Sequence, residues 1–301
     1  MTAAPCSFPH RPSDVARAWP RALTMSTSQH LQTYLDGLVA HFERAAFIAD
    51  DPIAIPHAFD DPRDQEVIGL YAALLAWGRR ETVLMKLADL CERMEYRPYE
   101  YVLGFCESRD APSLDSFKHR TFQPEDALWF TKSLSLLLRR HDTVEAIFSS
   151  HLDEDAEDIG DAIEGFSRSI AEAIAETPDR LRKHLARPRS GSACKRLCMY
   201  LRWMVRPGPV DLGIWRSMHP RQLVLPLDVH SGRQARILGL LQRKANDWRS
   251  ALELTRQCRQ FSPEDPARFD YALFGLGVYG DPLTEQNDVL ALRAAIDKEV
   301  S

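Results

Sequence analysis

The chain has 301 residues, of which 45% are hydrophobic and 27% charged, and its formal net charge is −5. This length and apolar content exclude a chain that is disordered throughout, because they suffice for one large domain or two small ones with a buried core. The sequence also lacks a signal peptide and any apolar run of membrane length, which predicts a cytoplasmic protein.

The first two dozen residues contain several prolines and no sustained helical periodicity. They predict a disordered arm, which we place at residues 1–28, or else they are an artefact of a start codon upstream of Met25. A helical domain of two lobes is predicted from residue 29 to residue 281, and residues 282–301 form a C-terminal tail.

The first half of this domain shows the helical period. Apolar residues recur at i, i+3, i+4 and i+7 from Leu31 to Phe42, which predicts an amphipathic helix. Further helices are predicted over 65–78, 81–94, 124–140, 142–152 and 161–176. No alternating apolar run bounded by hairpin turns is present, so the predicted fold class is all-α.

The second half begins with a basic stretch rich in Pro, Gly and Ser over 177–193, which predicts a loop. Helices are then predicted over 194–206, 228–238, 246–261 and 265–275. Their expected ends are capping residues: Asp228 or Asp265 at the start, and Gly239 or Gly275 at the stop.

Charge is unevenly distributed along the chain. Residues 180–260 contain 18 Lys and Arg against 4 Asp and Glu, a local balance of +14, so the rest of the chain carries −19. This asymmetry predicts a basic lobe with a cationic face suited to a phosphate backbone. The alternative is that the arginine-rich helices only form a solvated surface.

The stretch LPLDVHSGRQARILGL, residues 225–240, raises a choice between capping and chemistry. Asp228 is explained by an N-cap alone, because its carboxylate satisfies amides at a helix start. However, it lies in a series of Pro226, Asp228, His230 and Arg233 that is followed by Leu-Gly-Leu. Some thirty residues earlier, the small-residue turn SGSA leads into a helix whose second residue is Lys195.

This combination resembles the helix-hairpin-helix DNA glycosylase superfamily, the group of endonuclease III. Lys195 matches the lysine that attacks the sugar in that family, and Asp228 matches its catalytic aspartate. The interval between them is most similar to that of archaeal 8-oxoguanine DNA glycosylases. QEVIGLYAALLAWGRRETV resembles the family's N-terminal core helix, and FDYALFGLG resembles its closing helix. The chain also resembles a bacterial domain family of unknown function.

The chain departs from the superfamily pattern in three places. The hairpin signature is absent, since the corresponding residues are ARPRSGSACKRL. Trp77, Gly78, Arg79 and Arg80 replace the glutamine that ends the core helix. No four-cysteine cluster closes the chain, so the sequence implies no iron-sulfur cluster, and we expect no cofactor.

The resemblance implies a monomeric, nucleoid-associated DNA repair enzyme that flips a damaged base, 8-oxoguanine above all, out of the duplex. Lys195 would be the nucleophile of a glycosylase and AP lyase, and Asp228 the electrostatic stabiliser or general base. The residues expected to contact DNA are Gly191, Ser192, Arg196, Arg202, His230, Arg233 and Arg236. Those expected to border the base pocket are Trp77, Arg79 and Arg80.

Two other functions compete with this one. The first is a non-catalytic DNA- or RNA-binding protein, which the missing hairpin signature favours. The second is a hydrolase that holds a metal with Asp228 and His230, although no further ligands follow at metal-binding spacing. Cys194 and Cys198 also have no second pair with zinc spacing, so we expect no metal site and interpret them as buried thiols.

Overall fold

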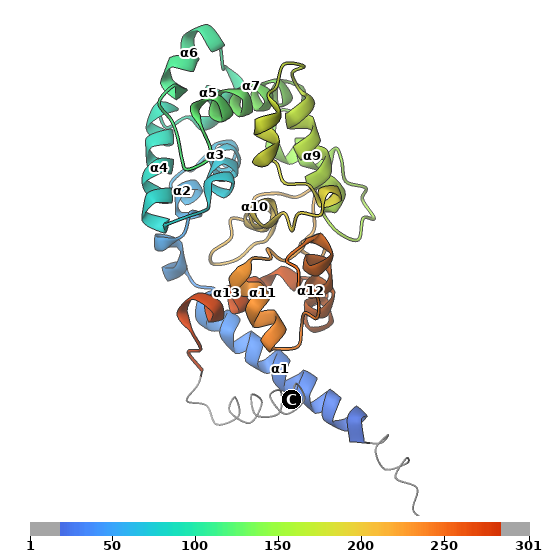
Figure 1. Ribbon diagram of the computed structural model, residues 1–301. Coiled ribbons are helices and arrows are strands. Elements are labelled where there is room, and N and C mark those ends of the chain that lie inside the picture. Colours follow the sequence, from blue (N-terminus) through green and yellow to red (C-terminus); the bar gives the residue numbers. More distant parts are fainter. Residues whose placement is uncertain (1–18, 284–301) are drawn as a thin grey trace, which may run out of the picture.

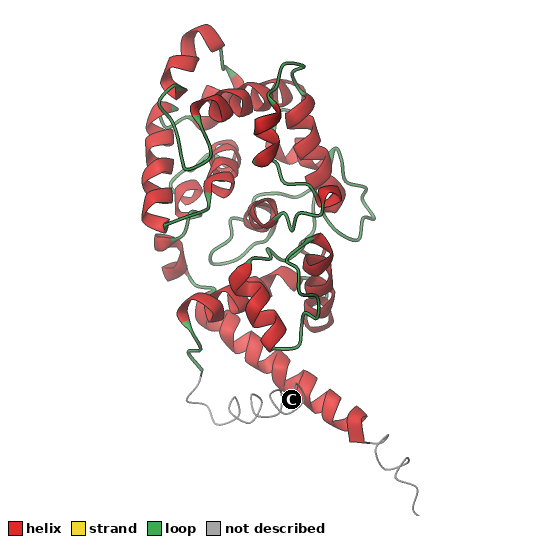
Figure 2. Cartoon of the chain, in the orientation of Figure 1, coloured by secondary structure: helices red, strands yellow, loops and turns green. Residues whose placement is uncertain are grey.

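The computed structural model describes residues 19–283, with side chains from residue 28 onward. Thirteen α-helices and five short 3-10 helices make up this part of the chain, and it contains no strand (Figure 2). The α-helices are α1 (Trp19–Phe42), α2 (Ala54–His57), α3 (Pro62–Leu75), α4 (Arg80–Arg93), α5 (Pro98–Leu103), α6 (Glu107–Leu114), α7 (Pro124–His141), α8 (Val144–Ser149), α9 (Gly160–Glu172), α10 (Lys195–Val205), α11 (Val229–Ile237), α12 (Trp248–Phe261) and α13 (Phe269–Tyr279). The 3-10 helices are η1 (Ala45–Asp50), η2 (Asp179–Lys183), η3 (Pro188–Ser190), η4 (Pro220–Gln222) and η5 (Pro266–Arg268). The predicted all-α class is confirmed.

The helices form two groups with α10 between them (Figure 1). Helices α2 to α9 make the upper group, in which α3 packs against α2, α5 and α10. The lower group combines the two ends of the described chain, since α13 packs against both α1 and α11. No helix within residues 19–283 is both long enough and apolar enough to cross a membrane.

Helix α10 is the central element because its residues are buried from Leu197 to Val205. Aromatic rings surround it: the ring centroids of Tyr200 and Trp215 lie 5.5 Å apart, and Phe148 stacks on Phe166 at 4.0 Å. Trp203 is fully buried. Burial of so many large side chains around one helix fixes the position of its N-terminus.

A buried carboxyl group ties α3 to this core without a cation. Glu66 accepts hydrogen bonds from the Val144 backbone N–H at 2.9 Å and from Trp215 Nε1 at 2.6 Å. Burial raises the pKa of Glu66 to about 7, because desolvation outweighs the two hydrogen bonds.

The structure revises several predicted helix boundaries. Helix α9 ends at Glu172 rather than at 176, and α13 begins at Phe269 rather than at 265, because Asp265 precedes η5 and caps no helix with its side chain. Helix α1 begins at Trp19, so it includes part of the arm predicted for residues 1–28; residues 1–18 lie outside the described residues. Helix α13 continues through Gly275 to Tyr279, so the predicted stop at Gly275 is wrong. A Cβ at Gly275 would lie 2.4 Å from the ring of Phe42, and the glycine therefore allows α13 to approach α1 closely.

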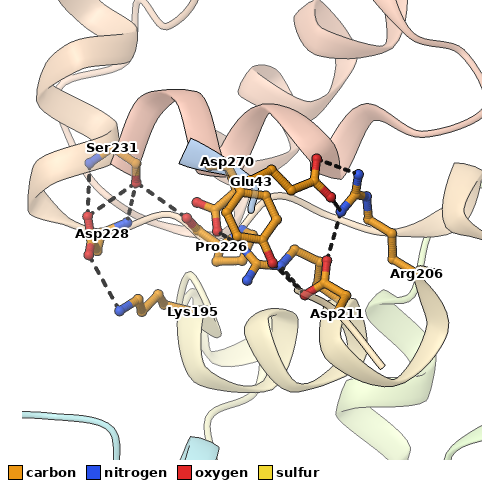
Figure 3. Close-up of polar contacts among 10 residues, drawn as sticks. Glu43, Lys195, Arg206, Asp211, Pro226, Asp228, Ser231 and Asp270 are labelled. Carbon is orange, nitrogen blue, oxygen red and sulfur yellow. Dashed lines mark hydrogen bonds and ion pairs between the residues drawn. The ribbon is translucent and has the colours of Figure 1, made fainter. Parts of the chain in front are cut away.

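A network of buried ion pairs joins α10 to the lower group, and we call it the Arg206 network (Figure 3). Arg206 pairs with Glu43, with Asp211 at 2.9 Å and with Asp265 at 2.7 Å. Arg202 pairs with Asp211 at 3.2 Å and with Asp270. The hydroxyl of Tyr271 donates to Asp211 Oδ1 at 2.7 Å. The network therefore connects the start of the described chain, its centre and its last helix.

Candidate active site

A cavity of about 780 Å³ opens where the two groups of helices meet. The junction of α3 and α4, the N-terminus of α10, the start of α11 and one face of α13 contribute its walls. Its charged lining residues are Asp51, Arg80, Lys195, Arg196, Arg202, Asp228 and Asp270. A cavity of this size, with a few charged groups on largely apolar walls, is typical of a small-ligand site.

Asp228 and Lys195 lie side by side in this cavity (Figure 3). Asp228 is the N-cap of α11, and its Oδ1 accepts from the backbone N–H groups of His230 at 2.8 Å and Ser231 at 2.9 Å. Its Oδ2 lies 3.4 Å from Nζ of Lys195. The two oxygens thus have separate roles, since one caps the helix and the other faces the amine.

The loop before α10 places Lys195 at the cavity. Gly191 has φ +80° and Cys194 has φ +50°, so the chain turns sharply twice before the helix begins. No side chain caps α10, in contrast to α11 and α12, which Asp228 and Asp247 cap. The first amides of α10 are therefore free of any side-chain acceptor, and together with the helix dipole they favour an anionic or carbonyl ligand.

Arg196 is partly buried on the adjacent wall. It donates to the Leu74 backbone carbonyl, and its guanidinium lies 4.6 Å from the ring centroid of Trp77. Trp77 also stacks on His184, with 5.9 Å between ring centroids and 18° between ring planes. Burial lowers the pKa of Arg196 to about 10, because no carboxylate compensates its charge.

Two buried aspartates complete the cavity, and neither belongs to the predicted site residues. Asp270 contacts Arg202 in the Arg206 network, and burial raises its pKa to about 7. Asp51 precedes α2, and burial also raises its pKa. Asp270 lies within FDYALFGLG, the segment that resembles the closing helix of the superfamily, whereas no periodicity or motif marks Asp51.

One wall of the cavity is aromatic. The ring of Phe274, one turn after Asp270 on α13, lies 5.9 Å from Nζ of Lys195 and 5.6 Å from the Arg80 guanidinium carbon, Cζ. Phe47 packs beside Phe274, with 6.4 Å between ring centroids. Phe274 is only half-buried, so its ring can contact a planar ligand.

The predicted base-pocket residues divide into two sets. Trp77 and Arg80 line the cavity, and Arg80 also donates to the hydroxyl of Tyr279 at its rim. Arg79 does not line the cavity. Its side chain is 84% exposed and forms an ion pair with Glu81, so it lies apart from the other two residues and its place at a base pocket stays a prediction.

The predicted DNA contacts also divide. Ser192, Arg196 and His230 line the cavity. Gly191 and Arg233 do not line it, and both are exposed. The prediction for Arg202 is wrong, because its side chain is only 5% exposed and is held by two buried carboxylates. Asp211 lies nine residues further along in a loop and Asp270 lies 68 residues away on α13, so helical periodicity reveals neither partner.

Arg236 clamps a loop. Its guanidinium donates to the backbone carbonyls of Arg243, Lys244 and Ala245 and to Asn246 Oδ1, at distances from 2.7 to 3.1 Å. Asn246 in turn donates to the Asp228 backbone carbonyl at 3.0 Å. These bonds occupy Arg236, which the sequence predicted to contact DNA, and they hold the loop against the start of α11.

The tertiary structure neutralises much of the basic segment. Ten of the 18 Lys and Arg residues between 180 and 260 form ion pairs, most of them with acidic residues from outside the segment. Lys183, Arg221, Arg233, Lys244 and Arg249 are exposed and form no ion pair within the described part of the chain. The predicted cationic face is therefore smaller than the sequence count suggests.

In the part of the chain that the structure describes, cysteines and acidic residues show no metal-binding arrangement. Among residues 19–283, no group of three or more His, Cys, Asp or Glu side chains is placed to hold a metal ion. Cys194 and Cys198 are buried free thiols, and burial raises the pKa of both. Asp228 and His230 thus gain no third ligand from the described residues.

The fold and the cavity define a class of all-helical proteins in which a lysine at one helix start meets a capping aspartate at another. Residues 51–279 match the model of a family described as a protein of unknown function, DUF2400. Because this match covers more than half of the chain, the chain belongs to that family. No curated protein and no solved structure gives a significant match.

Proposed function

We propose that the protein is a DNA glycosylase with AP-lyase activity that excises an oxidised purine, 8-oxoguanine above all. The observation that carries the proposal is the 3.4 Å approach of Lys195 Nζ to Asp228 Oδ2 inside the cavity. An amine beside a fixed carboxylate is the pair that a lysine nucleophile needs, because the carboxylate can take the ammonium proton. The resemblance to the glycosylase superfamily assigns the same two roles to Lys195 and Asp228.

The reaction begins when the deprotonated Lys195 amine attacks C1′ of the damaged nucleotide. The C1′–N9 bond breaks, its electron pair leaves with the base, and the base takes up the proton that Asp228 accepted from the Lys195 ammonium. Asp228 stabilises the positive charge that develops on the sugar and accepts the proton from nitrogen. Opening of the sugar ring then yields a Schiff base between Lys195 and C1′, from which β-elimination cleaves the strand.

DNA would approach the cavity at the start of α10. The uncapped amides of this helix and the exposed Gly191 allow a phosphate oxygen to come close. Arg233 on α11 is exposed and forms no ion pair among the described residues, so it is suited to a phosphate contact. Flipping brings the base into the cavity, where Phe274 offers an aromatic face.

The alternative is a non-catalytic nucleic-acid-binding protein. The observation in its favour is the segment before α10, which forms the short 3-10 helices η2 and η3 rather than a second α-helix. A protein of this kind would keep salt-sensitive binding and release no base.

Borohydride trapping separates the two functions. Duplexes that carry 8-oxoguanine, uracil, an abasic site or no lesion are incubated with the wild-type chain, with Lys195→Ala and with Asp228→Asn. Lys244→Ala is the matched control, because Lys244 is exposed and does not line the cavity. We expect a covalent adduct on the 8-oxoguanine and abasic duplexes that Lys195→Ala abolishes, Asp228→Asn reduces at least about 100-fold, and Lys244→Ala retains. Salt-sensitive binding without adduct or base release would establish the alternative.

A further inference from the structure

Three carboxyl groups line the cavity, and they differ in their partners. Asp228 uses Oδ1 to cap α11, and its Oδ2 lies 3.4 Å from Nζ of Lys195. Asp270 pairs with Arg202. Asp51 lines the same cavity but forms no ion pair among the described residues. It is therefore the carboxyl group of the cavity that no cation within residues 28–283 contacts directly.

The carboxyl group of Asp51 is oriented but not fully used. Its Oδ1 accepts from the Ile53 backbone N–H at 3.1 Å, and this bond fixes the group at the start of α2. Its Oδ2 has no hydrogen-bond partner among the described residues. Burial raises the pKa of Asp51, and this effect outweighs the opposing influence of three cations that lie beyond ion-pair distance. A fixed carboxylate with one free oxygen and a raised pKa is suited to taking a proton from a ligand.

Packing brings Asp51 toward Lys195. Asp51 directly follows η1, and Phe47 of η1 packs beside Phe274 with 6.4 Å between ring centroids. The ring centroid of Phe274 lies 5.9 Å from Nζ of Lys195. Lys195 is also one of the three cations that act on Asp51 electrostatically. Asp51 thus lies farther from Nζ than the capping carboxylate of α11 does, but still within its electrostatic reach.

We infer that Asp51 is a second catalytic carboxylate, the base that removes the C2′ proton when the strand is cleaved. In the Schiff base, C1′ is bonded to Nζ of Lys195, and C2′ lies one bond further away. The carboxylate of Asp228, which contacts Nζ, serves the nitrogen, whereas a base for C2′ has to lie beyond that contact. This inference rests on the proposed function and divides its two steps between two aspartates.

The elimination moves one proton and breaks one carbon–oxygen bond. Asp51 Oδ2 takes the proton from C2′, the C–H electron pair forms a C1′=C2′ double bond, and the iminium electrons move to Nζ of Lys195. The enamine then returns its electron pair, a C2′=C3′ double bond forms, and the C3′–O bond breaks. The 3′-phosphate leaves with the electrons of that bond, so the step needs no oxidant and no further reactant.

The test measures base release and strand cleavage separately on an 8-oxoguanine duplex under single-turnover conditions. A denaturing gel shows direct cleavage, and the same gel after hot alkali shows total base release, because alkali cleaves every abasic product. Asp51→Asn should lower the ratio of direct cleavage to base release about 100-fold, since it removes the base from one step only. Asp51→Glu, which keeps a carboxylate, should restore part of this ratio.

Asp50→Asn is the matched control, because Asp50 precedes Asp51, is exposed and does not line the cavity. It should leave the ratio at the wild-type value. An unchanged ratio in Asp51→Asn, whether both rates fall equally or neither falls, would overturn the inference, while cleavage by the wild-type chain would still support the proposed function. Wild-type base release without direct cleavage would also overturn it. If the wild-type chain releases no base and forms no borohydride adduct, the proposed function fails and the inference with it.

Discussion

The Arg206 network and the Lys195–Asp228 pair are two clusters of cations and carboxylates that share helix α10. In the network, Arg206 and Asp211 have side chains only 6% and 0% exposed, and each has several charged or hydrogen-bonded partners. In the pair, Lys195 and Asp228 are 30% and 18% exposed and leave capacity for further bonds. The same types of group thus serve stability where they are closed and saturated, and chemistry where they stay open.

The choice of cation follows this division. Arginine has a rigid fork of donors that can satisfy two or three carboxylates at once, so it suits the closed network. Lysine is a single amine that can lose its proton, which a permanently charged guanidinium cannot do. A lysine at the open end of α10 and arginines in its buried part are therefore the expected arrangement.

The largest effect should come from breaking the network. Arg206→Met leaves Glu43, Asp211 and Asp265 without their main cation, so we expect the free energy of unfolding in urea to fall by about 3–5 kcal/mol. Lys195→Met should change it by less than about 1 kcal/mol, because the pair is partly exposed. Equal losses in the two variants would remove the distinction between the clusters.

A smaller effect concerns Glu66, a buried carboxyl group that belongs to neither cluster and has no cation. Its pKa is about 7 in the folded state against 4.5 ordinarily, so the folded chain binds more protons than the unfolded chain between these pH values. The free energy of unfolding should therefore fall as pH rises through this window, by at most about 3 kcal/mol. Urea denaturation from pH 4.5 to pH 8 measures this slope.

Glu66→Gln should flatten the slope, and Glu176→Gln, at an exposed glutamate, should keep it. The glutamine variant should also be less stable at every pH, since its amide nitrogen faces one of two N–H donors. An unchanged slope in Glu66→Gln would show that other groups cause the pH dependence.

The third prediction concerns the clamp that supports the open pair. Arg236→Gln should lower the free energy of unfolding by about 1–2 kcal/mol, because it removes several bonds to the loop at 243–246. Amide exchange in residues 243–247 should accelerate. Arg233→Gln, one turn earlier on α11, should stay within about 0.5 kcal/mol of wild type, because Arg233 is exposed. Unchanged amide exchange of residues 243–247 in Arg236→Gln would show that Arg236 does not hold this loop in place.

The smallest expected change in the free energy of unfolding concerns Asp228, and two substitutions separate its two roles. Asp228→Ala should cost about 1 kcal/mol through loss of the N-cap, whereas Asp228→Asn should keep the cap and cost much less. Both variants should lose borohydride trapping. Asp61 caps α3 outside the cavity, so Asp61→Ala should show a similar loss of stability with normal trapping. Activity in Asp228→Asn would leave Asp228 as a cap alone.

Sequence patterns predicted most local features correctly. The helical period located α3, α4, α7 and α10 within a few residues, and Asp228 and Gly239 bound α11 as expected. Short helices such as α2 and α5 were missed, because four to six residues are too few to show a period. The predicted helix end at Gly275 was wrong, because in the sequence a glycine that allows two helices to pack closely cannot be distinguished from a glycine that ends a helix.

The candidate site could be predicted only in part. The resemblance to the glycosylase superfamily paired Asp228 with Lys195, and the structure places the carboxylate oxygen and the amine 3.4 Å apart. Asp51 could not be found, since it lies in a connection whose proximity to α10 depends on packing. Arg79 and Arg80 are neighbours in sequence, yet only Arg80 lines the cavity, because α4 begins between them.

The sequence by itself determined the all-α class, the caps and the apolar faces, since each depends on residues within a few positions of one another. The tertiary structure decided which charged side chains are buried in ion pairs and which remain exposed. Arg202, which looks like a surface residue of an amphipathic helix, is buried because Asp211 and Asp270 arrive from a loop and from α13. Electrostatic pairing acts between groups that are adjacent in space, and only the packed chain defines which groups those are.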